Sequence, residues 1–159
     1  MNFFEQIKIG DRYALGSHRF AADEIVSFAR RFDPQPFHID EDAAKRSHFG
    51  ALCASGWHTA CIWMRLMVEF RKREADGRRA RGERVAVIGP SPGFRELKWL
   101  KPVYVGDTIT YESEVTATRL SASRPDFGLV TLLNAGSNQR DERVISFVST
   151  AFVPTHPAS

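Results

Sequence analysis

The N-terminal third of the chain contains apolar residues that repeat with the period of a helix. Four of them, spaced i, i+3, i+4 and i+7, fall on one helical face: Ile25, Phe28, Ala29 and Phe32. This pattern predicts an amphipathic helix over Ala22–Phe32, capped by Asp23 and ended by Pro34. A second, short helix should start at Asp40, where three acidic residues precede two basic ones, an order that suits the helix dipole.

The stretch Gly56–Phe70 is apolar nearly all round in its first turns, which is typical of a buried helix. We therefore expect Trp57 and Trp63 to pack in the core, with a platform for the substrate as the alternative, and Met64 to fill space in the core. The expected role of His58 is a structural hydrogen bond within this helix. The sequence thus predicts one long central helix.

Beyond residue 84 the period changes from helical to alternating. The short segments rich in β-branched and aromatic residues are Arg84–Ile88, Gly93–Leu100, Asp107–Arg119, Gly128–Asn134 and Val144–Val153. In the third of these, one strand face would carry Ile109, Tyr111, Ser113, Val115 and Ala117. Gly89–Gly93 should form a loop, and Pro154–Ser159 a frayed or extended tail. Helices followed by strands indicate an α+β fold with one curled antiparallel sheet around the central helix.

Composition places the chain among ordinary globular proteins. Its 159 residues are enough for one domain with a sizeable core. No segment reaches the roughly 18 apolar residues that a membrane span needs, because Arg65 and Glu69 interrupt the best candidate. The N-terminus lacks a basic region followed by an apolar one, so no secretory signal is expected. Cys53 and Cys61 match no metal spacing and are expected as buried free thiols, so we expect a cytoplasmic protein.

Positive charge is concentrated in one segment. The formal net charge of +3 is too small to indicate nucleic-acid binding by itself. The segment Arg71–Arg84 carries seven basic and three acidic residues. We expect a solvated loop there; the alternative is a clamp for the phosphates of coenzyme A, because arginine forks fit phosphate oxygens.

The segment 32–56 carries the candidate chemistry. Asp33 and His38 lie five positions apart around Pro34 and Pro36, whose rings hold the backbone in a rigid, largely extended loop. The helix that starts near Gly56 presents free backbone amides, which can bind an oxygen atom.

These residues resemble a known family. The motif Asp33-x-x-Pro36-x-His38, with Gly56 eighteen residues later at the head of an apolar helix, resembles the hydratase-2 motif of MaoC-like dehydratases, the (R)-specific enoyl-CoA hydratases. The run Phe94–Asp107, with its Pro-Val-x-Val-Gly-Asp turn, is similar to the family's second motif. The resemblance spans roughly Gly10–Val153 and implies a single hot-dog domain over residues 1–159.

The resemblance implies an acyl thioester hydratase or dehydratase. Asp33 and His38 would add water to a trans-2-enoyl thioester and return a proton to carbon, giving the (R)-3-hydroxyacyl product. The Gly56 N–H would stabilise the enolate oxygen, and glycine would let the ligand carbonyl approach the backbone. No metal or redox cofactor is implied. The partners would be acyl-CoA or an acyl-carrier thioester, and a second copy of the chain, with neither nucleic acid nor membrane.

Two positions differ from the family pattern. Gln35 stands where relatives often carry Asn, and its expected role is to shape the loop. Met64 stands where some relatives carry a hydroxyl group near the catalytic acid, so one hydrogen bond to the water or the dyad would be missing.

Other interpretations remain open at this point. Asp33 could be a turn residue before proline, and His38 a structural hydrogen bonder that caps the Asp40 helix. A hot-dog thioesterase is the rival enzyme, although such enzymes often carry an acid on the central helix and none occurs between Gly56 and Val68. A non-catalytic module that binds acyl thioesters is the rival from another class. A nucleic-acid binder would need steeply salt-dependent affinity.

Overall fold

The computed structural model describes residues 2–156, so residues 157–159 of the tail predicted over Pro154–Ser159 lie outside this range. The helices are η1 (Phe4–Gln6, 3-10), α1 (Ala22–Phe32), α2 (Pro36–Ile39), α3 (Glu41–Arg46) and α4 (Gly56–Ala80). The strands are β1 (Arg12–Arg19), β2 (Gly93–Trp99), β3 (Thr108–Leu120), β4 (Phe127–Ser137) and β5 (Arg143–Pro154).

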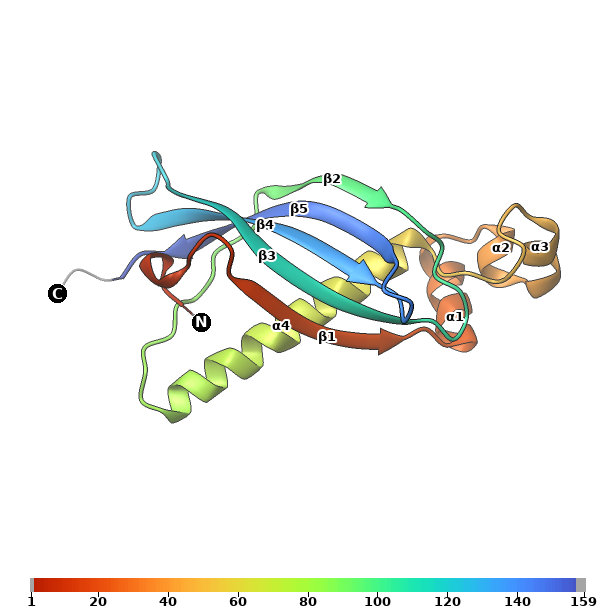
Figure 1. Cartoon of the computed structure of the whole chain (residues 1–159), viewed down its shortest axis with the longest axis horizontal. Helices are drawn as coiled ribbons and strands as arrows, with labels where there is room; N and C mark the ends of the chain where they lie inside the picture. The colour runs from red at the N-terminus through yellow and green to blue at the C-terminus, as the bar shows by residue number, and fades with distance from the viewer. Residues whose placement is uncertain (1, 157–159) are drawn as a thin grey trace.

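The five strands form one curled antiparallel sheet along the length of α4, which confirms the predicted hot-dog arrangement (Figure 1). The strand order is β1-β3-β4-β5-β2, so β1 and β2 are the edges. Figure 1 shows α1, α2 and α3 gathered at one end of the sheet beside the start of α4, with both chain termini at the opposite end. The candidate site residues therefore lie at the helical end.

One face of α4 supplies the centre of the core. Ile62, Trp63 and Leu66 are buried against the concave face of the sheet. Tyr111 of β3 is fully buried, and its hydroxyl donates to the carbonyl oxygen of Thr59, 3.0 Å away. This bond removes the cost of burying an unpaired hydroxyl and fixes the first turns of α4 against the sheet.

The alternation predicted for β3 holds over most of the strand. Ile109, Tyr111, Ser113 and Val115 are buried as expected, but Ala117 is exposed. The pairing of β3 with β4 shifts register between Val115 and Ala117, and such a bulge moves the following side chains to the other face.

The predicted first helix has the bounds Ala22–Phe32, but Asp23 does not cap it. The residue at the cap is Ala21, whose N–H donates to the side chain of Glu24. Phe32, expected on the buried face, is 67% exposed. Helix α3 starts one residue after the expected position because Asp40 serves as its N-cap, accepting from the Ala43 N–H at 2.6 Å.

The strand prediction was wrong at two places: one strand was missed, and one predicted strand does not form. Strand β1 was missed, because its alternation is weak and Leu15 is its one buried residue. The segment Arg84–Ile88 is not a strand; Ala86 is buried there, but the backbone joins no ladder. The chain therefore does not run from helices to strands, since β1 precedes α1 and pairs with β3.

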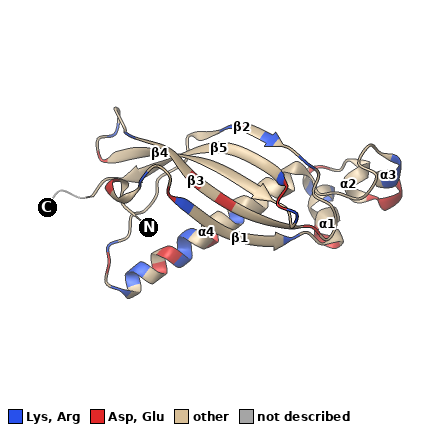
Figure 2. Ribbon diagram, in the orientation of Figure 1, with Lys and Arg blue, Asp and Glu red and all other residues tan. Residues whose placement is uncertain are grey.

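The basic segment is mostly helical, not a loop. Helix α4 continues to Ala80, ten residues beyond the predicted end at Phe70. Figure 2 shows basic and acidic residues alternating along this half of the helix. Ion pairs hold three of the arginines: Arg78 with Glu83, Arg79 with Asp76, and Arg81 with Glu83. Its use as a phosphate clamp stays a prediction.

The central helix is not buried all round. Trp57 and Met64, both expected in the core, are 48% and 49% exposed, and Cys61 is exposed beside them. Trp63 and Cys53 are buried, as predicted. An apolar stripe along α4 thus remains open to solvent in the single chain.

The Val-Gly-Asp turn ties the sheet to the segment before α4. Gly106 has φ 89°, a left-handed conformation that favours glycine. The buried Asp107 accepts from the Tyr104 N–H at 2.8 Å and closes the turn. The Ala54 N–H donates to the Val103 carbonyl at 2.8 Å, so the turn holds the residues that lead into α4.

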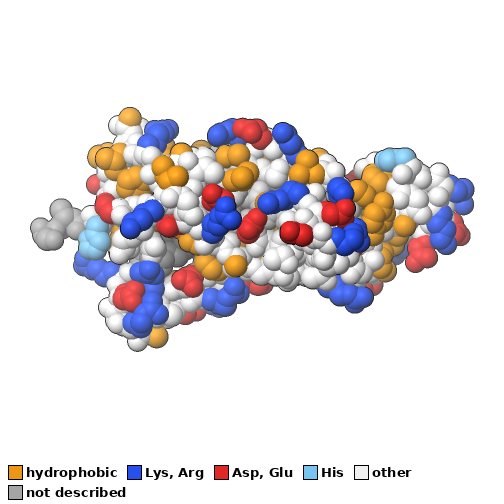
Figure 3. Space-filling view, in the orientation of Figure 1, with side chains coloured by type: hydrophobic (Ala, Val, Ile, Leu, Met, Phe, Trp, Pro, Cys, Tyr) orange, Lys and Arg blue, Asp and Glu red, His pale blue; other side chains and the backbone are white. Residues whose placement is uncertain are grey.

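No helix within residues 2–156 is long and apolar enough to cross a membrane. On the face in view in Figure 3, Lys and Arg side chains alternate with Asp and Glu.

His58 is buried in an aromatic environment and does not make the expected hydrogen bond. Its ring stacks on Phe28 at 4.5 Å and meets the edge of Phe20 at 5.1 Å. Its Nδ1 is buried and has no hydrogen-bond partner among residues 2–156. Burial disfavours the charged imidazolium and lowers the pKa of His58 to about 4, despite the opposing charge of Glu24.

This pKa predicts acid destabilisation. The unfolded chain, with an ordinary histidine, binds the proton more readily than the folded one, so stability is complete above about pH 6.5 and falls toward pH 4. The loss amounts to about 3 kcal/mol at most. We expect His58→Gln to flatten the plot of unfolding free energy against pH over this window.

Urea unfolding at a series of pH values measures this slope. His48→Gln is the matched control, because His48 is exposed. An identical slope in wild type and His58→Gln would show that His58 does not cause the acid sensitivity.

Candidate active site

Asp33 lies where α1 ends. Its backbone departs from helical geometry, with φ −153° and ψ 68°, since Pro34 prevents the helix from continuing. Two side chains donate to its carboxylate: Ser55 Oγ to Oδ2 at 2.6 Å and Gln35 Nε2 to Oδ1 at 2.8 Å. Gln35 thus shapes the loop by donating a hydrogen bond to the Asp33 carboxylate.

His38 lies on α2 and not on an extended loop as predicted. Pro36 occupies the first position of this short helix, where its missing N–H costs nothing. The His38 Nδ1 lies 2.7 Å from the Cys53 carbonyl oxygen. A carbonyl oxygen only accepts hydrogen bonds, so Nδ1 carries a proton and Nε2 is the ring nitrogen that faces the cavity side chains.

Asp33 and His38 are brought together. The His38 Nε2 lies 3.5 Å from Asp33 Oδ2, and their side chains are only 7% and 18% exposed, respectively. Burial alone would raise the pKa of Asp33, but the hydrogen bonds from Ser55 and Gln35 and the nearby imidazole lower it overall. Asp33 therefore stays ionised at neutral pH.

Ser55 is a site residue that the sequence interpretation missed. It is fully buried and caps α4 by accepting from the Trp57 N–H at 3.2 Å, while its own proton goes to Asp33. The available signal was a serine directly before a predicted helix start, which is a preferred N-cap. The Ser55 side chain thus both caps α4 and donates a hydrogen bond to the Asp33 carboxylate.

Gly56 is the first residue of α4, and within residues 2–156 no acceptor lies on its N–H. The predicted reason for glycine at this position, close approach of a ligand carbonyl to the backbone, was wrong in part. A Cβ at this position would lie 2.4 Å from the Trp99 ring, so the space is filled by an indole and not left for a ligand carbonyl. Glycine is required here because Trp99 packs directly on the helix start.

One open cavity of about 480 Å³ is lined by Asp33, Gln35, His38 and Gly56. Much of the remaining lining is apolar and aromatic: Phe32, Phe37, Phe49, Trp57, Trp99 and Val144. The wall includes Trp57, whose ring meets the edge of Trp99 at 5.2 Å. Met64 is absent from this lining, so its lack of a hydroxyl does not affect the pair directly. An apolar cavity with a few convergent polar groups is the usual form of a small-molecule site.

No group of three or more His, Cys, Asp or Glu side chains in residues 2–156 is arranged to hold a metal ion. The chemistry available from Asp33 and His38 is that of an ionised carboxylate beside an imidazole. Such a pair can orient a water molecule and take its proton.

The chain is similar to known proteins both in sequence and in structure. A profile of the MaoC like domain matches residues 6–132. The crystal structure of a MaoC-like dehydratase from Rhodospirillum rubrum is 39% identical, covers 99% of this chain and 100% of its own, and superposes with a TM-score of 0.82.

Two curated relatives extend this result. An uncharacterised Bacillus subtilis protein, YdeM, is 28% identical over 88% of this chain and 90% of its own length. The (R)-specific enoyl-CoA hydratase of Aeromonas caviae is 30% identical over 72% of this chain and 75% of its own length. The sheet topology, the site geometry and these similarities agree, and the chain belongs to the MaoC-like family of hot-dog proteins.

Proposed function

We propose that the protein is an acyl thioester hydratase or dehydratase that interconverts trans-2-enoyl and (R)-3-hydroxyacyl thioesters. The observation that carries the proposal is the buried pair of Asp33 and His38, 3.5 Å apart, on the wall of an apolar cavity beside the start of α4. Family membership and the A. caviae relative support hydratase chemistry in general, and that relative is the basis for the (R) product.

In the proposed reaction, water binds between Asp33 and His38. The His38 Nε2 accepts the water proton while the water oxygen adds to the β-carbon of the enoyl group. The ionised Asp33 stabilises the imidazolium that forms, and the imidazolium then gives its proton to the α-carbon. One water is consumed, and no electron acceptor is needed. The reverse sequence dehydrates the hydroxyacyl thioester.

Negative charge develops on the thioester oxygen during this addition. The Gly56 N–H, at the positive end of the long helix α4, is the proposed donor to that oxygen. Gly56 lines the cavity, and its N–H has no acceptor within residues 2–156, so it can donate to a ligand oxygen.

A thioesterase is the rival reaction. No acidic residue lies on α4 before Glu69, so the first turns of the helix offer no carboxylate to attack the carbonyl or activate water for it. The hydratase proposal is favoured because the two groups that could handle protons, Asp33 and His38, lie outside α4, at the end of α1 and on α2.

Absorbance of the conjugated enoyl-CoA chromophore tests the proposal. We expect a panel of trans-2-enoyl-CoA thioesters to lose this absorbance without releasing free thiol. Thiol release would identify a thioesterase instead. Ligand binding with neither change would identify a binding module.

The same assay tests the dyad. Asp33→Asn and His38→Ala should each lower turnover by about 10²-fold or more, as for general acid–base groups. The double variant should lose little beyond the worse single variant, because the two groups act on one water. Thermal melting controls for folding. Near-wild-type turnover in either folded single variant contradicts the assignment.

Ser55 should act as a positioning residue. Ser55→Ala removes the 2.6 Å hydrogen bond to Asp33, so we expect the Asp33 pKa to rise and kcat to fall with little change in KM. Loss of the cap should also cost about 1 kcal/mol of stability. Ser55→Thr keeps the hydroxyl and should restore the Asp33 pKa and part of kcat.

Carboxyl NMR titration and steady-state kinetics on the three proteins separate these effects. A lower melting temperature with unchanged Asp33 pKa and kcat would limit Ser55 to capping the helix.

We also propose that the protein forms a homodimer through β2. This edge strand is exposed at every residue except Leu97, and its outer side has no strand partner among residues 2–156. Apolar side chains are exposed on β2 and on α4: Phe94, Trp99, Trp57, Met64 and Val68. Pairing two such edges would satisfy their backbone groups and cover these side chains.

Sedimentation at micromolar concentration should show a dimer. Phe94→Asp places a charge on the β2 edge and should shift the protein toward monomer. Leu120→Asp is the matched control, since Leu120 is 63% exposed on β3, away from that edge. A wild-type monomer with full activity would contradict the proposal.

A further inference from the structure

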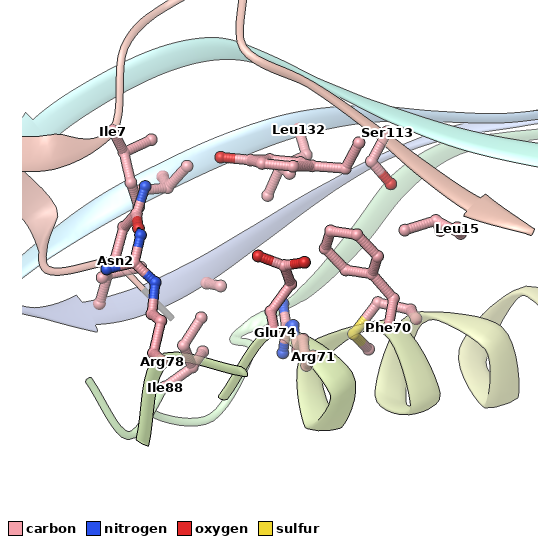
Figure 4. Close-up of a pocket in the computed structure, with 15 residues that line it drawn as sticks. Asn2, Ile7, Leu15, Phe70, Arg71, Glu74, Arg78, Ile88, Ser113 and Leu132 are labelled. Atoms are coloured by element: carbon pink, nitrogen blue, oxygen red, sulfur yellow. The ribbon is translucent and has the colours of Figure 1, made fainter. Parts of the chain in front are cut away.

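A second cavity lies under the C-terminal half of α4 (Figure 4). It encloses about 230 Å³ between this half of the helix and the concave face of the sheet. Its walls are mainly apolar side chains: Ile7, Leu15, Met67, Phe70, Leu132 and Val153. In Figure 4, Phe70 rises from α4 while Leu132 and Ser113 face it from the sheet.

This cavity is separate from the one at Asp33 and His38. The two share no lining residue. Arg71 follows Gly56 by fifteen positions, which corresponds to about 22 Å along a helix axis. The buried core residues Trp63 and Leu66 occupy the intervening turns of α4. A ligand in the second cavity would therefore not contact the proposed catalytic pair.

Arg71 gives the cavity a positive group without a counter-ion. No carboxylate in residues 2–156 lies within ion-pair distance of its guanidinium, whereas Arg78, Arg79 and Arg81 each have an acidic partner. Arg71 is half-buried, and burial lowers its pKa with no opposing charge to compensate. A partly desolvated, unpaired guanidinium reduces stability and is suited to bind an anion.

Other polar side chains also line the cavity. Tyr13 lines the cavity with its ring against Phe70, 5.8 Å between centroids, and burial raises the pKa of its hydroxyl, which remains a donor. Arg78, bonded to Asn2, lines the same end. Figure 4 shows the Glu74 carboxylate also turned toward the cavity, where it opposes an anion.

We propose that this cavity binds a short- to medium-chain fatty carboxylate, with the carboxylate on Arg71 and the alkyl chain along the apolar walls. The charge of Arg71 requires an anionic head, and a carboxylate matches its fork. The apolar walls require an alkyl chain, which inorganic phosphate and nucleotides lack. The volume, below the usual range for drug-sized ligands, limits the length of the chain.

Isothermal titration calorimetry with octanoate tests the proposal on the full-length protein. Wild type should bind, and Arg71→Met should bind at least tenfold more weakly, because the new side chain keeps the bulk and loses the charge. Lys72→Met is the matched control: it removes one positive charge from the neighbouring position, which is exposed and does not line the cavity. It should bind octanoate as wild type does.

Two further comparisons probe the head group. Octan-1-ol has the same alkyl chain without the charge, and it should bind wild type about as weakly as octanoate binds Arg71→Met. Glu74→Gln removes the opposing carboxylate and should strengthen octanoate binding. Equal affinity for octanoate and octan-1-ol would mean that the head group is not recognised, and would overturn the proposal.

Asp33→Asn tests whether octanoate binds in the cavity of the proposed catalytic pair instead. This variant leaves the second cavity unchanged, so it should bind octanoate with wild-type affinity. Arg71→Met should also keep a melting temperature no lower than wild type, since it removes an unpaired guanidinium. Unchanged octanoate affinity in Arg71→Met, or no binding to wild type at millimolar octanoate, would overturn the proposal without affecting the proposed hydratase reaction.

Discussion

The candidate site depends on how the short segment before α4 is held. Ala54 pairs with Val103, and Cys53 bridges Tyr104, so the Val-Gly-Asp turn fixes this segment against the sheet. This segment then contributes two hydrogen bonds to the site, one from its backbone and one from a side chain. The Cys53 carbonyl accepts from His38, and Ser55 two residues later donates to Asp33. The two sequence motifs of the family are thus one structural unit, in which the later motif fixes the geometry of the earlier one.

The hydrogen bonds around Asp33 and His38 suit different roles for the two side chains in the proposed reaction. Asp33 receives two hydrogen bonds that favour its ionised form, while His38 Nδ1 donates to a carbonyl and Nε2 lies toward the carboxylate. In that reaction Nε2 would take the water proton, and the carboxylate would supply orientation and charge. One of the two hydrogen bonds to the carboxylate comes from Ser55, which caps α4 and belongs to neither motif.

The sequence predicted those parts of the fold in which local pattern and tertiary environment agree. Helix α1 and strand β3 were found because burial on one face produces a clear period. Strand β1 was missed because an edge strand with one buried residue leaves little alternation. The end of α4 was misplaced because charged residues alternate there and mimic a solvated loop.

For the site, the sequence predicted Asp33, His38 and Gly56 as neighbours, and the structure brings them to one cavity. The contributions of Ser55 and Trp99 come from contacts across 22 and 43 positions of the chain (55 − 33 and 99 − 56). No local period reports such contacts, so a single sequence could not reveal them.

Trp99 also links the cavity to the edge of the sheet. It is the last residue of β2, and its ring packs on Gly56 and Trp57, while residues 100–103 continue along the cavity wall. A strand that paired with β2 would therefore lie beside Trp99, the side chain that packs against the start of α4. Trp99 is itself 47% exposed, so the proposed dimer would cover it. In that dimer, the indole that packs at the start of α4 would also lie at the interface between the two copies.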